Sequence, residues 1–362
     1  MTQDDIVAVI GAGMGGKGIL AVLGLQDYRL RVRDTVDAQV AGIRAAGGLH
    51  VEGRAKRFAP VELATTDLAA AVTGASTILV SIYGRDHPQL AGELAPLLVN
   101  GQTLVLMQGH FGGAIAFAKA LSEHGCSAAL DLAEVDGYPY MLEVLAPDRV
   151  ELQTDKAFYQ LSSVPASKAP DLVERLKPAF PGLRESKSWL DTAFADFGGI
   201  LHTGAMITNV GKVEGRDPYN FYAATMTPSV CRLIAAMDRE RIAVACAYGV
   251  DTIDVAQWLE ETYGRKESNL HEKLQVNATL HYRSSPAPLS MDHRFFMSDV
   301  PCFLVPLASL ACVAAIETPV IDSMITVANS LAQRDFRAEG RNLERLGLAQ
   351  KSRYQIIEEA RV

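Results

Sequence analysis

Short apolar runs alternate with amphipathic stretches along the first half of the chain. Residues 6–10 are continuously apolar, and residues 17–25 then carry apolar side chains at helical spacing. Residues 28–33 alternate between polar and apolar, whereas residues 77–82 and 103–107 are again uninterrupted apolar runs. Such runs are typical of parallel strands that are covered on both faces. The pattern therefore predicts an α/β domain built on a doubly wound parallel sheet.

Further elements of this domain are expected up to about residue 185. Helices are predicted over residues 87–98 and 114–124, a strand over residues 128–135, and two short strands within residues 150–164. Four prolines between residues 165 and 181 then mark a short helix and a linker. We therefore assign residues 1–185 to a first domain.

Helical patterns dominate residues 186–362, which predicts a second, all-helical domain. Thr227 and Pro228 form an N-cap with proline in the first turn, and this helix is expected to run to about Tyr248. Two shorter helices are predicted over residues 253–263 and 319–331. The apolar run of residues 300–316 is short for a membrane span and contains two prolines, so it predicts a buried helix.

The junction between the first strand and the first helix reads G-x-G-x-x-G, the pattern of a dinucleotide-binding turn. In this pattern the first glycine permits the tight turn, the second lets a pyrophosphate approach, and the third lets helix and strand pack closely. The helix N-terminus adds amide groups and a partial positive charge for the phosphates. The candidate cofactor contacts are Gly11, Gly13, Met14, Gly15 and Gly16.

Asp34 closes the second strand, eighteen residues after Gly16. An acid at this place accepts hydrogen bonds from the adenosine ribose of NAD and repels the 2′-phosphate of NADP. The sequence therefore favours NAD, while Arg31, Arg33 and Lys17 leave NADP open. The alternative is an ordinary surface aspartate beside a glycine-rich turn.

Ile82 and Tyr83 follow another strand at the carboxyl edge of the predicted sheet. Ligands bind at that edge in open α/β sheets, so both residues are candidate cofactor contacts. For Tyr83 the alternative is a tyrosine of the hydrophobic core.

Composition narrows the class of protein. A chain of 362 residues has room for two domains of about 150 residues each. A net charge of −8 argues against nucleic acid or an anionic membrane as the partner. The five cysteines form no C-x-x-C pair, which predicts reduced core thiols in a cytoplasmic protein, and the histidines lack metal-ligand spacing.

The second half carries a series of motifs in a characteristic order. They are His202 within residues 198–206, residues 209–214, Phe221-Tyr222, Ser229-Val230, residues 238–241 (DRER) and residues 293–306 (HRFFMSDVPCFLVP). In this order and spacing the chain resembles the opine dehydrogenase (octopine/nopaline dehydrogenase) family over essentially its whole length. The resemblance implies a Rossmann domain followed by a 6-phosphogluconate dehydrogenase-like helical domain. The chain departs from the family at Gly198-Gly199, where the family often has Asn-Pro.

The resemblance also implies a reaction. The amine of an amino acid condenses with the carbonyl of a 2-oxo acid, and NAD(P)H reduces the resulting imine to an opine. His202 would be the acid/base group, since imidazole titrates near neutral pH. Asp299 would be the carboxylate that orients the imidazole, as in a catalytic triad. The alternatives are a buried helix histidine and an N-cap aspartate.

Several other polar residues are candidates for binding or chemistry. The planar guanidinium of Arg294 suits a substrate carboxylate, with a structural ion pair as the alternative. Arg283 and Lys212 are weaker candidates for the second carboxylate. His110 follows a predicted strand and is expected beside the cofactor. The charged residues 238–241 are expected on a solvated, salt-bridged helix face.

Two other functions remain open on the sequence alone. A 3-hydroxyacid or ketopantoate-type reductase would share the scaffold, but such enzymes rely on a central lysine. A cofactor-binding protein without turnover is the other alternative. The helical domain could bury its apolar surface internally or against a second copy, which leaves a homodimer open.

Overall fold

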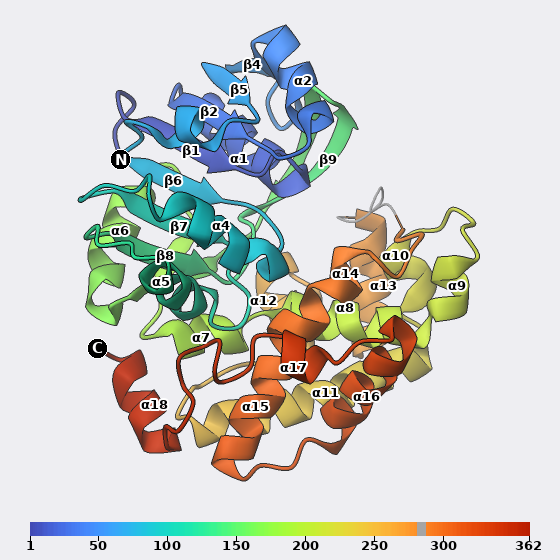
Figure 1. Ribbon diagram of the computed structural model, residues 1–362. Helices are drawn as coiled ribbons and strands as arrows, with labels where there is room; N and C mark the ends of the chain where they lie inside the picture. Colours follow the sequence, from blue (N-terminus) through green and yellow to red (C-terminus); the bar gives the residue numbers. More distant parts are fainter. Residues whose placement is uncertain (281–286) are drawn as a thin grey trace. The chain divides into compact units, whose positions relative to one another are not determined.

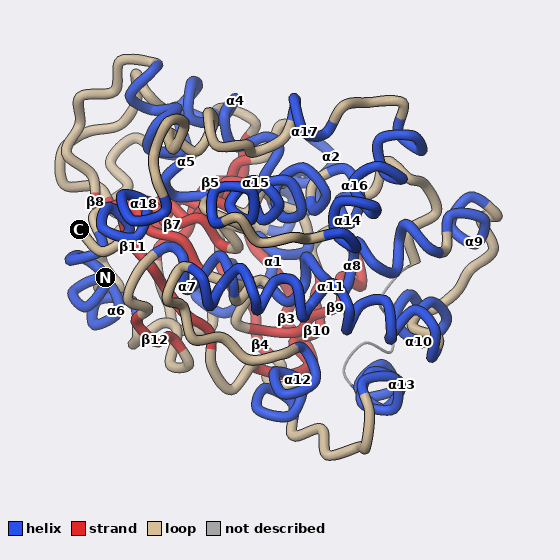
Figure 2. The backbone as a smooth tube through the Cα atoms, turned by 90° about the horizontal axis from the view of Figure 1, so that it is seen from below, coloured by secondary structure: helices blue, strands red, loops and turns tan. Residues whose placement is uncertain are grey.

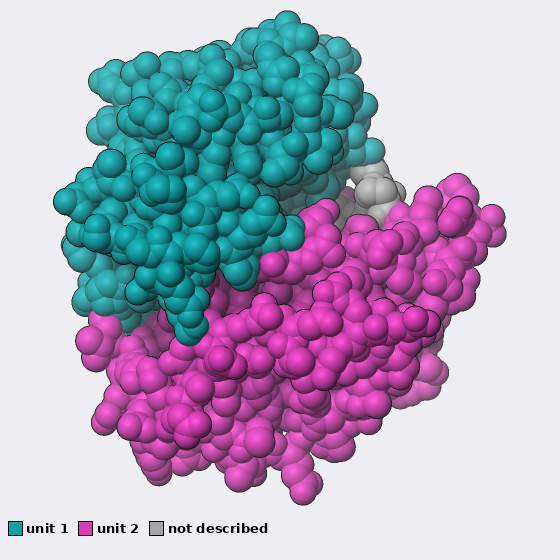
Figure 3. All heavy atoms as spheres, viewed as in Figure 1, with its two compact units in different colours: residues 1–82, 86–109, 117–187 teal, residues 83–85, 110–116, 188–362 magenta. Residues whose placement is uncertain are grey.

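The structure, a computed structural model, describes residues 1–280 and 287–362. All described strands lie before residue 186, and helices make up most of the remaining chain (Figures 1 and 2). The chain divides into two compact units (Figure 3). Unit 1 comprises residues 1–82, 86–109 and 117–187, and unit 2 comprises residues 83–85, 110–116 and 188–362.

An eight-stranded sheet forms the centre of unit 1, in the order β12-β11-β8-β7-β6-β1-β2-β5. Six of these strands, β5-β2-β1-β6-β7-β8, are all parallel and follow the 3-2-1-4-5-6 order of dinucleotide-binding folds. Strand β11 adds to β8 in the antiparallel sense and pairs in parallel with β12. The bounds are β1 Ile6–Ile10, β2 Arg29–Arg33, β5 Leu63–Thr65, β6 Thr77–Val80, β7 Thr103–Met107, β8 Asp131–Val135, β11 Tyr159–Val164 and β12 Leu183–Glu185.

Helices connect these strands, as the hydrophobic pattern predicts. They are α1 Met14–Gly24, α2 Asp37–Ala46, α3 Leu68–Val72, α4 His87–Leu94, α5 Gly113–Glu123 and α6 Ala169–Leu176. The predicted doubly wound sheet is confirmed. The helix expected over residues 87–98 is shorter, because α4 ends at Leu94 and turns follow.

A second, four-stranded sheet in unit 1 was not predicted. Its order is β4-β3-β10-β9, with β3 Gly48–Gly53, β4 Arg57–Pro60, β9 Tyr140–Ala146 and β10 Arg149–Asp155. The two strands expected within residues 150–164 therefore belong to different sheets. The second sheet covers α1, where a Cβ atom on Gly18 would lie 2.1 Å from the Tyr140 ring and one on Gly24 2.5 Å from Ala59. These close approaches fix the helix that follows the glycine-rich turn.

Helix α8 carries His202 and lies among several helices of unit 2. Helix α8 contacts α11, α14 and α16. The predicted long helix is confirmed, because the Thr227 hydroxyl caps α11 by accepting a hydrogen bond from the Val230 amide. The helices are α7 Trp189–Phe194, α8 Phe197–Thr208, α9 Val210–Glu214, α10 Phe221–Thr225, α11 Pro228–Ala247, α12 Val255–Tyr263, α13 Leu270–Leu280, α14 Arg294–Met297, α15 Val305–Ala314, α16 Pro319–Ala332, α17 Phe336–Glu339 and α18 Arg353–Ala360.

The apolar run near residue 300 forms a core helix. It begins as a π-helical turn over Val300–Leu304 and continues as α15, so it is less regular than expected. The stretch Arg294–Ala314 is long and apolar enough to cross a membrane by length and composition. However, 78% of its most apolar window is buried inside the protein.

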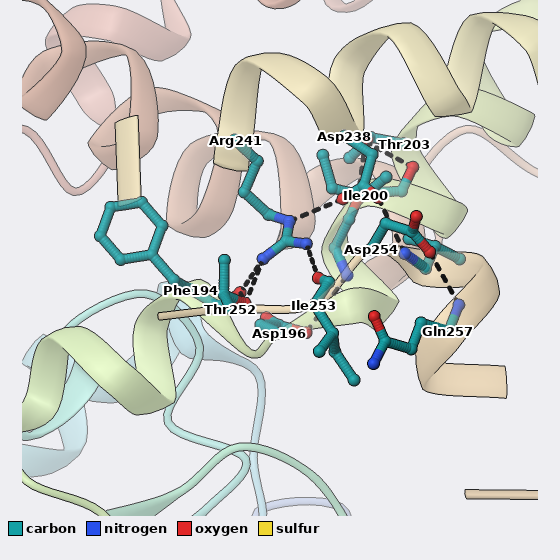
Figure 4. A network of polar contacts seen from close by, with 12 residues as sticks. Phe194, Asp196, Ile200, Thr203, Asp238, Arg241, Thr252, Ile253, Asp254 and Gln257 are labelled. Atoms are coloured by element: carbon teal, nitrogen blue, oxygen red, sulfur yellow. Dashed lines mark hydrogen bonds and ion pairs between the residues drawn. The ribbon is translucent and has the colours of Figure 1, made fainter. Parts of the chain in front are cut away.

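The charged residues 238–241 are not a solvated face, so this part of the expectation was wrong, whereas the expected salt bridge is present between Asp238 and Arg241. Arg241 is fully buried and Asp238 is 3% exposed. The Arg241 guanidinium donates to the Asp238 carboxylate and to the carbonyls of Phe194 and Ile253 (Figure 4). Glu240 accepts the first amides of α16, from Val320 and Ile321. Only Arg239 is exposed.

The cysteines also differ from expectation. All five are free thiols, but only Cys231 and Cys302 are buried, whereas Cys246 and Cys312 are exposed. The description as core thiols therefore holds for two of them.

Candidate functional site

The glycine-rich turn of unit 1 has the geometry that its sequence implies. Gly11 adopts a φ of +103°, and a Cβ atom there would lie 2.2 Å from the Ser81 carbonyl oxygen. A Cβ atom on Gly16 would lie 1.7 Å from the Gly11 carbonyl oxygen, so helix and strand touch at this point. At Gly13 nothing lies within 4 Å of such an atom. The turn is closed on the protein side and open where a pyrophosphate would approach.

The start of α1 is suited to an anion. Gly13 is its N-cap, no side chain caps it, and its first turn holds no acidic residue. Met14 is 49% exposed. The amide groups and partial positive charge of this helix end fit a dinucleotide pyrophosphate. Binding through Gly11, Gly13, Met14, Gly15 and Gly16 stays a prediction.

Asp34 is tied to the same turn. Its carboxylate accepts hydrogen bonds from the Ala12 amide at 2.7 Å and from the Val36 amide at 2.9 Å. Two of the neighbouring cations are engaged elsewhere, since Arg31 donates to the carbonyls of Ala70 and Thr73. The Arg33 guanidinium lies 3.3 Å from the Glu93 carboxylate.

Ile82 and Tyr83 have different environments. A Cβ atom on Gly11 would lie 3.0 Å from the Ile82 side chain, so Ile82 borders the glycine-rich turn. Tyr83, which belongs to unit 2, is 43% exposed and carries the Arg85 guanidinium 5.6 Å from its ring centre. A role for Tyr83 in the hydrophobic core is therefore wrong. Cofactor contact by either residue stays a prediction.

Within unit 2, His202 and Asp299 meet although ninety-seven residues separate them. Nδ1 of the imidazole lies 2.7 Å from Oδ2 of the carboxylate, and both side chains are buried. Asp299 has helical backbone angles and its side chain makes no capping hydrogen bond. Asp299 therefore occupies the N-cap position of the Val300–Leu304 turn, as the alternative expects, but its side chain does not cap that turn. The carboxylate orients the ring of His202.

The other edge and one face of the imidazole are also occupied. The Tyr222 hydroxyl lies 2.9 Å from Nε2. The Phe295 ring stacks on the imidazole with 3.7 Å between centroids and an interplanar angle of 18°. Phe221 approaches the imidazole edge-on, with 6.3 Å between centroids. Rotation of His202 would therefore break two hydrogen bonds and a stack.

Burial decides the charge state of the His202–Asp299 pair. Burial lowers the pKa of His202, although the hydrogen bond and charge of Asp299 act in the opposite direction. For Asp299 burial alone would raise the pKa, but the hydrogen bond and charge of His202 outweigh it and the net pKa is lowered. The resting pair is thus a neutral imidazole beside a carboxylate.

The three cationic candidates for substrate binding differ in position. The Arg294 guanidinium lies 4.6 Å from the centre of the Phe295 ring, next to the His202 stack. In residues 1–280 and 287–362 it forms no ion pair, so the alternative structural role is not found. Lys212 is exposed, with Nζ 5.1 Å from the Tyr219 ring centre. Arg283 lies outside the described residues.

His110 forms a second buried imidazole–carboxylate pair, with Asp196. Nδ1 lies 2.9 Å from Oδ2, and both residues belong to unit 2. The other oxygen of Asp196 caps α8 by accepting a hydrogen bond from the Gly199 amide. This pair therefore holds the first turn of the helix that presents His202. The expected place of His110 beside the cofactor stays a prediction.

The departure from the family pattern at Gly198-Gly199 has a local physical reason. A Cβ atom on Gly199 would lie 2.3 Å from Cγ of Phe303. In addition, proline at this position would lack the amide that Asp196 accepts. Phe303 and the Gly199 amide together explain why a glycine suits this chain.

Acidic, histidine and cysteine side chains do not gather into a metal-like cluster anywhere in the described ranges. Among the predicted site residues, the structure brings His202 and Asp299 together and places Arg294 beside them through Phe295. Sequence reasoning missed Asp196 and gave Tyr222 no role. The spacing of twenty residues between His202 and Tyr222 crosses two turns and a short helix, so periodicity could not pair them.

Comparison with known proteins decides the family. The chain is 31% identical to an opine dehydrogenase of Arthrobacter sp. (strain 1C) over 351 residues, which covers 96% of this chain and 97% of that one. The chain belongs to the opine dehydrogenase family. Residues 185–332 match the alpha-helical domain of NAD/NADP octopine/nopaline dehydrogenases.

Solved structures share the fold. An octopine dehydrogenase in complex with NADH and agmatine superposes with a TM-score of 0.77 at 17% identity, covering 98% of both chains. The same kind of enzyme with NADH and pyruvate gives a TM-score of 0.74 at 18% identity, covering 95% of both chains. This opine dehydrogenase family member is an NAD(P)-dependent oxidoreductase, which confirms the resemblance and the cofactor class predicted from the sequence.

Proposed function

We propose that this enzyme condenses an amino acid with a 2-oxo acid and reduces the product with NAD(P)H to an opine. The observation that carries the proposal is the buried pair of His202 and Asp299, 2.7 Å apart, in a chain 31% identical to an opine dehydrogenase. Octopine dehydrogenase structures that hold NADH with agmatine or pyruvate support an amine and an oxo acid as substrates.

The overall reaction balances as amino acid, 2-oxo acid, NAD(P)H and a proton giving opine, NAD(P)⁺ and water. Attack of the amine on the carbonyl forms a carbinolamine, whose hydroxyl leaves as water once it is protonated. A dinucleotide held by the glycine-rich turn and Asp34 would supply the hydride for the imine carbon. His202 protonates the leaving hydroxyl, takes a proton back from the nitrogen as the neutral imine forms, and returns it to that nitrogen when the hydride adds, so one proton is consumed overall.

Asp299 allows a buried imidazole to act as an acid and a base. Its carboxylate accepts a hydrogen bond from the Nδ1–H group, so that proton stays on the ring. Nε2 is therefore the nitrogen that exchanges protons with the substrate. The negative charge also stabilises the imidazolium, which burial otherwise disfavours. A neutral resting imidazole is suited to accept a proton during the reverse, oxidative reaction.

Within this proposal the cationic residues hold the substrate carboxylates. Arg294 binds the carboxylate of the oxo acid, supported by its position on the Phe295 ring beside His202. Lys212 and Arg283 are candidates for the second carboxylate. In unit 1, Asp34, Ile82 and the glycine-rich turn bind the dinucleotide, with NAD favoured because Asp34 is fixed at the turn. Tyr83, the next residue in the sequence, is a further candidate cofactor contact.

A substrate matrix tests the proposed function. Many amino acids are crossed with pyruvate, glyoxylate and 2-oxoglutarate while NADH and NADPH oxidation is followed. We expect oxidation only when an amine and an oxo acid are both present. Oxidation by the oxo acid alone would favour a hydroxyacid-type reductase. Tight NADH binding without turnover across the panel would favour a cofactor-binding protein.

A variant tests the role of His202. H202A should lower kcat by about 10²–10⁴-fold, the usual contribution of a general acid–base group. NADH binding, measured by fluorescence, should stay close to that of the unaltered enzyme. Near-normal turnover in H202A would end the proposed role.

The proposal also places the enzyme in the cytoplasm, supported by five free thiols. Assembly as a homodimer is part of the proposal that light scattering of the purified protein would test. If light scattering gives the mass of a monomer at all concentrations used for kinetics, the homodimer is wrong.

A further inference from the structure

We propose that Tyr222 carries the proton between Nε2 of His202 and the substrate nitrogen. The inference rests on the proposed function and adds a residue to its acid–base chemistry. The distance from the Tyr222 hydroxyl to Nε2 is 2.9 Å. Because Asp299 occupies Nδ1, the phenol is the group that the exchangeable nitrogen meets.

The surroundings of the imidazole leave few other routes for a proton. Phe295 covers one face of the ring in a parallel stack. Asp299, on the opposite edge, is 0% exposed and His202 itself is 5% exposed. Protons move along hydrogen bonds, and the bond at Nε2 leads to the Tyr222 oxygen. The relay therefore runs from Asp299 through His202 to Tyr222.

The position of the phenol is fixed by its helix. Asn220 caps α10 by accepting the Ala223 amide at 2.9 Å, so the first turn that carries Tyr222 is held. Phe221 is fully buried and packs at 4.9 Å from the Phe295 ring that stacks on His202. Tyr222 is 7% exposed. The same aromatic cluster thus orients both the imidazole and the phenol.

The proton transfer balances without a further reactant. In the resting state the imidazole is neutral, carries its proton on Nδ1 and accepts the Tyr222 O–H at Nε2. When His202 is protonated, its Nε2–H donates to the phenol oxygen while the phenol O–H passes to the substrate nitrogen. One N–H bond and one O–H bond break, and one of each forms. Tyr222 ends as a neutral phenol and His202 as a neutral imidazole.

The test compares Y222F with Y248F in steady-state kinetics. Tyr248 is a matched control, because its buried hydroxyl donates to the Leu310 carbonyl at 3.0 Å on another part of unit 2. We expect kcat to fall by about 10²-fold or more in Y222F, within the range of lost acid–base catalysis. KM for the oxo acid and NADH binding should change little. Y248F should keep its kcat.

The pH profile separates a relay from a structural role. Phenylalanine removes a donor that stabilises neutral His202, so the pKa of His202 should rise in Y222F. The charged and titratable groups around this imidazole are Asp299, Asp196, Arg294 and His293, and none of them changes in the variant. In the reductive direction His202 must be protonated, so the alkaline limb of kcat/KM should move to higher pH. A lower kcat with an unmoved limb, or an unchanged kcat, would overturn the relay.

A third measurement covers the case in which Y222F does not fold. Site-specific 3,5-difluorotyrosine at position 222 keeps the shape of the side chain and makes the phenol more acidic. Turnover and its pH dependence should then both change, and an unchanged profile would overturn the relay. NMR titration of His202, assigned with H202Q, reports the hydrogen bond without any turnover. If the wild-type enzyme oxidises NAD(P)H with no pair of substrates in the matrix, the proposed function is wrong. The hydrogen bond between His202 and Tyr222 is still tested by the NMR titration.

Discussion

Asp238 and Arg241 lie one helical turn apart on α11 and form an ion pair in the interior, with 2.7 Å between Oδ1 and Nε. Oδ2 of the same carboxylate accepts the Val255 amide at the start of α12. D238A would leave the Arg241 guanidinium buried without its counter-charge. We expect the free energy of unfolding to fall by about 3–5 kcal/mol, measured by urea denaturation.

Arg239 supplies the control for this prediction, since it is the exposed member of the same four residues. R239A should change the free energy of unfolding by less than about 0.5 kcal/mol. Equal losses in D238A and R239A would show that helix α11 tolerates an uncompensated guanidinium, contrary to our account.

The contact between Gly199 and Phe303 predicts a compensating pair of substitutions. G199A should cost about 1–3 kcal/mol of stability through overpacking, and G199P should cost more because Asp196 loses the Gly199 amide. Adding F303L to G199A should restore part of the loss. G211A is the control, because a Cβ atom at Gly211 would meet nothing within 4 Å. Purely additive losses in the double variant would contradict the packing explanation.

Stability should depend on pH through His293. Burial lowers its pKa to about 4, with the charge of Arg294 and of His202 acting in the same direction and Asp299 opposing. In the unfolded chain histidine titrates near its ordinary value of about 6.5. Between these values the unfolded chain binds a proton that the folded protein does not. The neutral His293 therefore contributes fully to the free energy of unfolding above about pH 6.5. This contribution is lost as the pH falls towards 4.

H293N tests this dependence, because asparagine can still cap α14 as His293 does. Urea midpoints measured from pH 7 to pH 4 should fall less steeply in H293N than in the unaltered protein. The difference should be up to about 3 kcal/mol. Parallel curves would assign the pH dependence to other groups.

Asp34 predicts how the enzyme distinguishes its two cofactors. D34A removes both the charge and the acceptor of the Ala12 amide, whereas D34N keeps an acceptor without the charge. KM for NADH should rise about tenfold in D34A and less in D34N. Use of NADPH should improve in both variants, because a 2′-phosphate no longer meets a carboxylate. If NADPH is already the better cofactor of the unaltered enzyme, the role of Asp34 is wrong.

Arg294 predicts a separation between substrate and cofactor kinetics. R294K keeps the charge but loses the planar, two-pronged donor. KM for the oxo acid should rise by about tenfold or more, while KM for NADH should stay within about twofold. A matching rise in both constants would assign Arg294 a structural role.

Local patterns predicted what depends on neighbours along the chain. Continuous apolar runs and the G-x-G-x-x-G turn placed β1, α1 and the parallel sheet. The second sheet was missed because β3 joins it by pairing with β10, about a hundred residues later, and the side chains of β3 and β4 are half exposed. Alternation alone does not show which strand a segment joins.

The same limit explains the misplaced charges and the missed tyrosine. Four consecutive charged residues are typical of a solvated face. In the interior, however, the carbonyls of Phe194 and Ile253 accept hydrogen bonds from the Arg241 guanidinium. The partners of His202 come from α10 and from the turn before α15. Family resemblance supplied Asp299, but only the folded chain brings Tyr222 to Nε2.

Residues 110–116 belong to unit 2 although unit 1 surrounds them in sequence. Phe111 packs against Phe194 and Phe303, and its carbonyl accepts the Arg341 guanidinium. A single crossover at residue 187 would therefore separate Phe111 from these neighbours. Chimeras that exchange helical halves between related dehydrogenases should carry this inserted segment along with the C-terminal half.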